Sequence, residues 1–243
     1  MAKRVGVILS GCGHRDGSDA AETLLALLII DRAGGQAICA APEPVRQEAA
    51  RLLHDEVRPL AELDAAGVDA LVIPGGGGVT TVLSDYAEKG QLCQVQPDVV
   101  RLLRALLQMR RPMGFVGLAG LLAARVLGPV AGVRLTLGSR GTHDAKHAAV
   151  MGADVRPGAI DDVIADERNR VYSTPGLEAE GARLAQVAKA IEKLSRALTS
   201  GPKHLPRPQH PSRPVAERPR FEPKPAASAP PSVDPIRRPS GPR

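Results

Sequence analysis

The chain alternates short apolar runs with longer segments in which apolar residues recur at helical spacing. The main short runs are largely apolar, whereas a strand with one solvated face alternates apolar and polar residues, so these strands are expected to be covered on both faces, as in a parallel sheet. The expected strands are Val5–Leu9, Gln36–Ala40, Val68–Ile73 and Met113–Val116, with shorter ones around 133–137, 162–165 and 170–173.

The segments between these strands carry the periodicity of amphipathic helices. Expected helices are one that ends at Gly34-Gly35 and others over 45–53, 99–109, 118–127 and 178–198. Strands that alternate with helices predict an α/β fold with a doubly wound, mostly parallel sheet and helices on both faces. Ligands of such sheets bind beyond the carboxyl ends of the strands, where the loops 10–18, 75–78 and 117–120 are expected to meet.

Composition divides the 243 residues into a domain and a tail. Residues 201–243 hold 13 of the 22 prolines and only one aromatic residue, Phe221, so this segment cannot bury enough apolar surface to offset the entropy of ordering. We therefore expect one domain over residues 1–200 and a Pro-rich, basic, disordered tail over 201–243. The tail carries a net charge of +6, which equals the charge of the whole chain, so the domain is neutral and the basic balance is no argument for a nucleic-acid-binding fold.

Cysteine usage and hydropathy bear on the compartment. Cys12, Cys39 and Cys93 are widely spaced and form neither a disulfide framework nor a C-x-x-C metal motif, which fits a reducing compartment. Val5–Leu9 is too short for the core of a signal peptide, and no stretch reaches the ~18 apolar residues of a membrane span. The sequence predicts a cytoplasmic protein without a membrane span.

The segment Pro112–Gly120 is typical of a nucleophile elbow that lacks its nucleophile. A short apolar run closes on Gly117 and passes directly into a helical pattern, which is the local structure that presents a catalytic serine or cysteine in many α/β enzymes. Glycine has no side chain that could attack a carbonyl. The run Gly75–Gly78, after another expected strand, could cradle an anion with its backbone N–H groups, although a tight turn explains such glycines equally well.

Several motifs together carry a family resemblance over nearly all of residues 3–198. They are Gly6–Gly13, Asp16–Ser18, Glu22, Glu56–Leu60, Asp69–Gly76, Pro112–Phe115, Met151–Ala153 and Ser173–Pro175. In order and spacing these resemble the ElbB/ES1 proteins, a branch of the DJ-1/PfpI and class I glutamine-amidotransferase-like superfamily. The resemblance implies a flavodoxin-like fold and, in active members, an elbow cysteine assisted by a glutamate of the first helix. It also implies weak glyoxalase activity and an association with isoprenoid biosynthesis.

The resemblance assigns expected roles to individual residues. Gly117 stands where the family places its elbow cysteine, Glu22 matches the helix glutamate, and the backbone of Gly75, Gly76 and Leu118 would hold an oxyanion or ligand. We therefore expect a relative with reduced or no catalytic activity that binds a small carbonyl or carboxylate metabolite. A homodimer is expected, with no cofactor and no metal site.

Two other functions stay open at this point. In one, the chain is an active glyoxalase-like enzyme that converts small dicarbonyls to hydroxy acids, with Cys12 or a water activated by Glu22 in place of the missing thiol. In the other, it is an interaction protein whose tail recruits an SH3-like domain or an anionic partner.

A pair of histidines is the remaining candidate for chemistry. His143 and His147 lie four residues apart on an expected helix with Asp144 between them, a spacing that permits metal ligation. Because no third ligand matches, a solvated helix face is the favoured interpretation.

Overall fold

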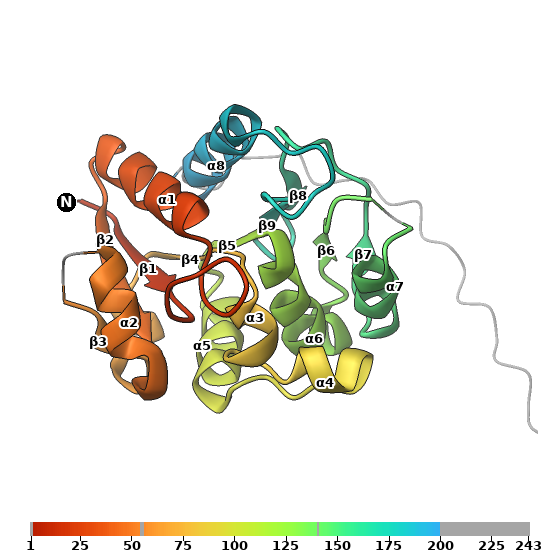
Figure 1. Ribbon diagram of the computed structural model, residues 1–243, viewed down its shortest axis with the longest axis horizontal. Helices are drawn as coiled ribbons and strands as arrows, with labels where there is room; N and C mark the ends of the chain where they lie inside the picture. The colour runs from red at the N-terminus through yellow and green to blue at the C-terminus, as the bar shows by residue number, and fades with distance from the viewer. Residues whose placement is uncertain (1, 54–55, 140, 200–243) are drawn as a thin grey trace, which may run out of the picture. The chain divides into compact units, whose positions relative to one another are not determined.

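The computed structural model describes residues 2–53, 56–139 and 141–199 (Figure 1). Within them, a seven-stranded sheet has the order β3-β2-β1-β4-β5-β9-β8, in which every neighbouring pair is parallel except β8 and β9. Its strands are β1 (Arg4–Ile8), β2 (Gln36–Ala41), β3 (Arg58–Pro59), β4 (Ala70–Ile73), β5 (Met113–Val116), β8 (Ile164–Asp166) and β9 (Val171–Thr174). The five central strands follow the flavodoxin order, so the predicted doubly wound, flavodoxin-like α/β fold is confirmed.

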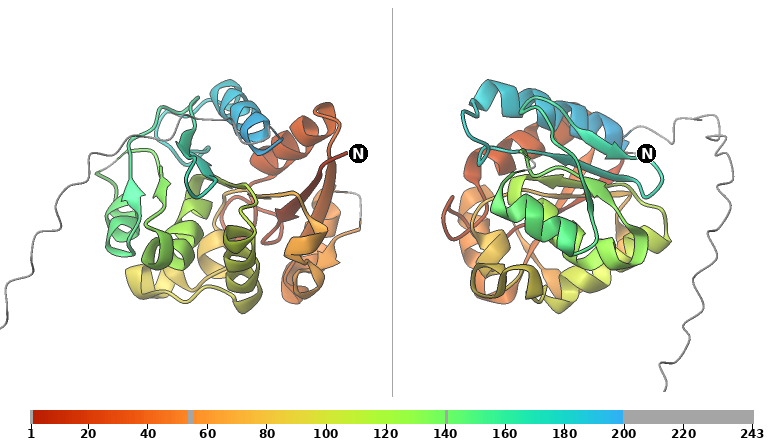
Figure 2. Two further views of the ribbon diagram at one scale, coloured as in Figure 1. Left: turned by 180° about the vertical axis from the view of Figure 1, so that it is seen from behind. Right: turned by 90° about the vertical axis from the view of Figure 1, so that its right-hand side faces the viewer.

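Helices cover both faces of the sheet (Figures 1 and 2). On one face α1 and α8 pack against each other, and on the other face α5 and α6 do so. Each face has its own apolar core, with Ala26 and Ile191 in the first and Leu103 and Leu122 in the second. The helices are α1 (Ala20–Arg32), α2 (Glu43–Leu53), α3 (Gly78–Thr81), α4 (Tyr86–Lys89), α5 (Pro97–Gln108), α6 (Gly120–Ala131), α7 (His143–Val150) and α8 (Leu184–Thr199).

The C-terminal third departs from expectation at the closing helix. The helix begins at Leu184 rather than at residue 178, because the chain passes through Gly181 at a φ of +74°, which is outside the helical region. Residues 175–183 therefore form a loop after β9, which changes the candidate site. A small second sheet of β6 (Arg134–Leu135) and β7 (Asp154–Val155) also lies in this third.

Two further predictions concern the C-terminal tail and the lack of a membrane span. The tail predicted over 201–243, and with it the domain boundary, lies outside the described residues. No helix within 2–53, 56–139 or 141–199 is long and apolar enough to cross a membrane.

Candidate functional site

The carboxyl ends of β1, β4, β5 and β9 meet at one edge of the sheet, and the loops that follow them form the candidate site. Chain connections leave β1 and β4 in opposite directions, which makes this a topological switch point. Backbone bonds join the first two loops, since Asp19 N donates to Gly75 O at 2.9 Å and Gly78 N donates to Gly17 O at 3.0 Å.

Glu22 projects from the first turn of α1 into the space between these loops. Asp19 caps the helix and its Oδ1 accepts a bond from Glu22 N at 3.0 Å, which fixes where the turn begins. The Glu22 side chain is fully buried, and its oxygens accept bonds from Gly75 N at 2.8 Å and Leu177 N at 2.6 Å. Burial and the neighbouring Glu178 charge raise the pKa of Glu22 to about 8, although the two backbone N–H groups oppose the rise.

Gly117 directly follows β5 and has the backbone geometry of an elbow. Its φ is +54°, and a turn of 3₁₀-helix over residues 117–119 leads directly into α6. A Cβ atom added at this position would overlap Glu178 Oε2 and would lie 3.4 Å from Pro175 O. The space that an elbow side chain would take is therefore filled by another residue of the same chain.

That residue, Glu178, reaches the site from the loop after β9. Its Oε1 accepts a bond from Gly76 N at 2.8 Å, whereas its Oε2 is buried and has no hydrogen-bond partner among the described residues. Burial raises the pKa of Glu178, and the Gly76 N–H opposes that rise. Sequence reasoning missed Glu178 because residue 178 was expected to begin a helix. The Pro175-Gly176 pair, a turn signal directly after a strand, was the available evidence for a loop at this edge.

The glycine-rich loop after β4 has its donors occupied. Gly75 N and Gly76 N bond to the two carboxylates, Gly77 N donates to His14 O at 2.8 Å, and Gly78 N donates to Gly17 O. Two of the three amides predicted to hold an oxyanion, those of Gly75 and Gly76, thus hold the protein's own carboxyl groups. The loop is made of glycines because the backbones approach so closely that a Cβ at Gly76 would overlap Gly17 O.

A cleft of about 720 Å³ lies beside Gly117 and Leu118. Its wall includes Glu178, and the charged residues described in it are all acidic, the others being Asp144 and Glu180. Glu22 is not in this wall, because it is sealed behind the loops. The described residues contain no group of three or more His, Cys, Asp or Glu side chains that could hold a metal ion.

Cys12 supplies none of the hydrogen bonds described above for the two carboxyl groups. It is half-buried on the loop between β1 and α1, where it forms an isolated parallel bridge with Ser18, and it is not in the wall of the cleft. The structure thus brings together Glu22, Gly75, Gly76 and Gly117 but leaves Cys12 at the edge of the group.

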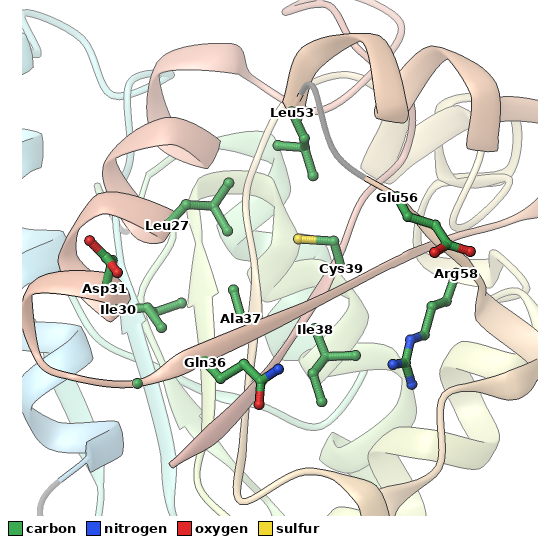
Figure 3. A pocket seen from close by; sticks show the side chains of 11 residues that line it. Leu27, Ile30, Asp31, Gln36, Ala37, Ile38, Cys39, Leu53, Glu56 and Arg58 are labelled. Atoms are coloured by element: carbon green, nitrogen blue, oxygen red, sulfur yellow. The ribbon is translucent and has the colours of Figure 1, made fainter. Parts of the chain in front are cut away.

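A second hollow, of about 530 Å³, lies at the opposite part of the fold, between α1, β2 and α2 (Figure 3). It lies along Gln36–Cys39, at the beginning of β2 rather than beyond its carboxyl end, and Arg58 borders it. No predicted site residue lines it. The cleft beside Gly117 is therefore the better candidate.

Comparison with known proteins agrees with this architecture. No family model matches the chain. It is 31% identical over 211 residues to human glutamine amidotransferase-like class 1 domain-containing protein 3, mitochondrial, covering 74% of this chain and 77% of the human protein. It is likewise 31% identical to the rat mitochondrial ES1 protein homolog, covering 73% of this chain and 76% of the rat protein.

Solved structures show the same fold at lower identity. An isoprenoid biosynthesis protein with an amidotransferase-like domain from Ehrlichia chaffeensis superposes with a TM-score of 0.75 at 24% identity, covering 81% of this chain and 98% of that one. Drosophila melanogaster DJ-1beta superposes with a TM-score of 0.55 at 20% identity, covering 82% and 91%.

The names of the curated relatives contradict the predicted cytoplasmic location, which was wrong. The human, rat and zebrafish proteins are all named as mitochondrial. Sparse cysteines and a short first apolar run distinguish a protein of a reducing compartment from one of an oxidising compartment. They do not distinguish a cytoplasmic protein from a protein of another reducing compartment.

Proposed function

Because the chain belongs to the ES1 family of glutamine amidotransferase-like class 1 proteins, we propose that it is a member without thiol chemistry, which binds a small neutral carbonyl compound and does not convert it. The observation that carries this proposal is the position of Glu178. Its carboxyl group fills the space of an elbow side chain and also takes the N–H of Gly76.

Covalent catalysis at this site would need a nucleophile, and Gly117 offers none. It would also need free donors at the place where negative charge develops on the substrate. Gly75 N and Gly76 N already donate to carboxyl groups, so an incoming oxyanion would have to displace them. The nucleophile is thus missing, and two of the three predicted donors are already taken, at the same edge of the sheet.

Neither substitute nucleophile predicted from the sequence is favoured by the geometry. Glu22 is fully buried and both its oxygens accept backbone bonds, so activation of a water in the cleft would need the loops to open. Cys12 does not line the cleft. These observations support a binding protein over a Cys12-dependent or Glu22-dependent enzyme.

The cleft supports a neutral ligand. Its volume of about 720 Å³ is within the range of small-molecule sites. The acidic side chains described in its wall would repel a carboxylate, so the carbonyl class of the two predicted ligands is favoured.

A direct test is to incubate the full chain with methylglyoxal and to measure hydroxy-acid formation. We expect no turnover above the protein-free background. Turnover that Cys12→Ser abolishes would overturn the proposal in favour of a thiol enzyme. Turnover that persists in Cys12→Ser and is abolished by Glu22→Gln would overturn it in favour of an activated water.

A pair of designed variants tests the role of Glu178. Gly117→Cys alone should stay inactive, because the new side chain overlaps Glu178 Oε2. Gly117→Cys combined with Glu178→Gly should gain turnover, whereas Gly117→Cys with Glu180→Gly, a matched change in the same wall, should not. Activity of the single variant would contradict the proposal that Glu178 blocks the elbow.

Ligand class can be tested by saturation-transfer NMR. We expect contacts with hydroxyacetone, a neutral carbonyl compound, and weaker contacts with pyruvate. Leu118→Trp, which narrows the cleft, should reduce the hydroxyacetone signal. Stronger binding of pyruvate would overturn the ligand class.

The homodimer and an SH3-like or anionic partner for residues 201–243 stay predictions. The first concerns a second chain, and the second concerns residues outside the described ranges.

A further inference from the structure

Four polar side chains form a cluster between α4 and α7, separate from the carboxyl pair. The Tyr86 hydroxyl donates to Asp144 Oδ1 at 2.6 Å and lies 2.9 Å from His147 Nδ1. The ring of His143 lies over the ring of His147, with 3.9 Å between the centroids. His143 is exposed, as a solvated helix face predicts, whereas His147 is half-buried because Tyr86 packs against it.

The hydrogen bonds fix the tautomer of a neutral His147. A hydroxyl group has one hydrogen, and the Tyr86 hydrogen is directed to the Asp144 carboxylate, which cannot donate in return. In the hydrogen bond between Tyr86 and His147, the histidine must therefore be the donor, so Nδ1 carries the hydrogen and the Tyr86 oxygen accepts it. The lone pair of His147 is left on Nε2, the atom that faces away from Tyr86 in the ring.

Tyr86 is suited to this orienting role. It is 7% exposed, and burial together with the Asp144 carboxylate raises the pKa of its hydroxyl above the usual range, so the group stays protonated and can donate. A buried group that holds the non-ligating nitrogen of a histidine is the usual outer-shell arrangement of zinc sites.

His143 and His147 are one helical turn apart, in the sequence His143-Asp144-Ala145-Lys146-His147. Histidines at this spacing lie on one face of a helix and together bind zinc in the H-E-x-x-H motif of metalloproteases. Here the second position is Asp144, the residue that Tyr86 holds. His143 is 77% exposed, so its ring is free to turn toward a cation beside His147.

We propose that His143 and His147 chelate a divalent cation of the zinc class, with Tyr86 orienting the His147 ring. Imidazole nitrogens suit Zn²⁺, Co²⁺, Ni²⁺ and Cu²⁺ rather than Mg²⁺ or Ca²⁺. Since no described residues supply a set of three ligands, water completes the coordination, and the site is exchangeable rather than structural. The site is independent of the proposed carbonyl binding, although Asp144 also borders the cleft beside Gly117.

The test is calorimetric titration of the untagged full chain with Zn²⁺, and with Mg²⁺ for comparison. We expect one Zn²⁺ per chain and no heat with Mg²⁺. His143→Ala and His147→Ala should each weaken Zn²⁺ binding more than tenfold, and Tyr86→Phe should weaken it about tenfold or more. With Co²⁺ as the probe, the visible absorption band of the bound ion should be lost in both histidine variants.

Controls use the other histidines. His14→Ala removes a side chain that also contacts an aspartate, Asp19, and should leave Zn²⁺ binding unchanged. A variant with His54, His204 and His210 replaced by alanine should also bind normally. Unchanged affinity in His143→Ala and His147→Ala, or loss of binding in either control, would overturn the proposal. Thermal melts confirm folding, and the exposed position of His143 makes His143→Ala the safer variant.

Discussion

The carboxyl pair Glu22–Glu178 and the cluster around Tyr86 both bury polar groups in one domain, but by opposite means. Glu22 and Glu178 are two carboxyl groups side by side, and backbone N–H groups of distant loops hold them. Tyr86, Asp144 and His147 are a matched set of donors and acceptors that bond side chain to side chain. The first arrangement depends on the close approach of backbone segments from different loops, whereas the second depends on side chains that supply both donors and acceptors.

This difference shows what each cluster needs from the fold. The carboxyl pair exists only because loops after four strands converge, with glycines that leave room for carboxylates and carbonyls. The Tyr86 cluster needs one turn of helix and one contact from α4. Perturbations of the backbone should therefore damage the first and spare the second.

The largest expected effect follows from a methyl group at Gly76. Its φ is +105°, and a Cβ would overlap Gly17 O and lie 2.5 Å from Asp19 N, both of which are backbone atoms. We expect Gly76→Ala to cost at least ~3 kcal/mol in the free energy of unfolding, or to prevent folding. Gly34→Ala is the matched control, because Gly34 also has a positive φ, +69°, but no atom within 4 Å of the added Cβ.

Gly34→Ala should cost about 1 kcal/mol, the penalty of the left-handed conformation alone. Urea unfolding measures both variants. Equal losses would mean that close approach of the loops is not what selects glycine at position 76.

The second effect is a dependence of stability on pH. Between the ordinary glutamate pKa of 4.5 and the value of about 8 for buried Glu22, the folded chain binds more protons than the unfolded chain. The free energy of unfolding should therefore fall as pH rises through this window, by a few kcal/mol (order of magnitude), and level off above it.

Glu178→Gln removes a carboxyl group whose own pKa is raised by burial, and loss of its charge should also lower the pKa of Glu22. On both counts the pH dependence of the melting temperature should become shallower. Glu180→Gln, a change at an exposed glutamate of the same loop, is the control and should leave the slope unchanged. A Glu178→Gln slope equal to that of the wild type would show that the two carboxyl groups do not interact.

The sequence predicted only those parts of the two clusters that lie within short segments of the chain. The apolar runs and the helical periodicity were enough to predict the sheet, and the apolar run that ends at Gly117 was enough to predict the elbow, because both signals lie in short segments of the sequence. Glu22 and Gly76 were singled out by resemblance. Their contacts with Leu177 and Glu178 join residues about 100 or more apart in the chain, which no periodicity encodes.

The Tyr86 cluster shows the converse limit. The spacing of His143 and His147 is visible in the sequence, but its meaning depends on a buried hydroxyl group from α4, 61 residues away from His147. Without that partner a solvated face was the reasonable interpretation. Local patterns thus located the histidines, and only tertiary contact oriented them.

The third effect tests the Tyr86 cluster itself. Tyr86→Phe removes both hydrogen bonds of the hydroxyl and leaves Asp144 Oδ1 and His147 Nδ1 without that partner, so we expect a loss of ~1–3 kcal/mol. Because the clusters use different side chains, the effects of Tyr86→Phe and Glu178→Gln should add within ~0.5 kcal/mol in a double-mutant cycle. A larger coupling energy would show that Asp144, which borders the same cleft as Glu178, links them.

The smallest effect concerns Cys12, which is on the loop between β1 and α1, N-terminal to the helix that carries Glu22. Cys12→Ser should change the free energy of unfolding by no more than ~0.5 kcal/mol, because the side chain is half-buried and serine is nearly isosteric. Cys93→Ser is the matched control, since Cys93 is 1% exposed within the apolar core and a hydroxyl group there should cost ~1–3 kcal/mol. If Cys12→Ser lowered the free energy of unfolding as much as Cys93→Ser, the Cys12 thiol would have to be packed among the loops around Glu22 and Glu178.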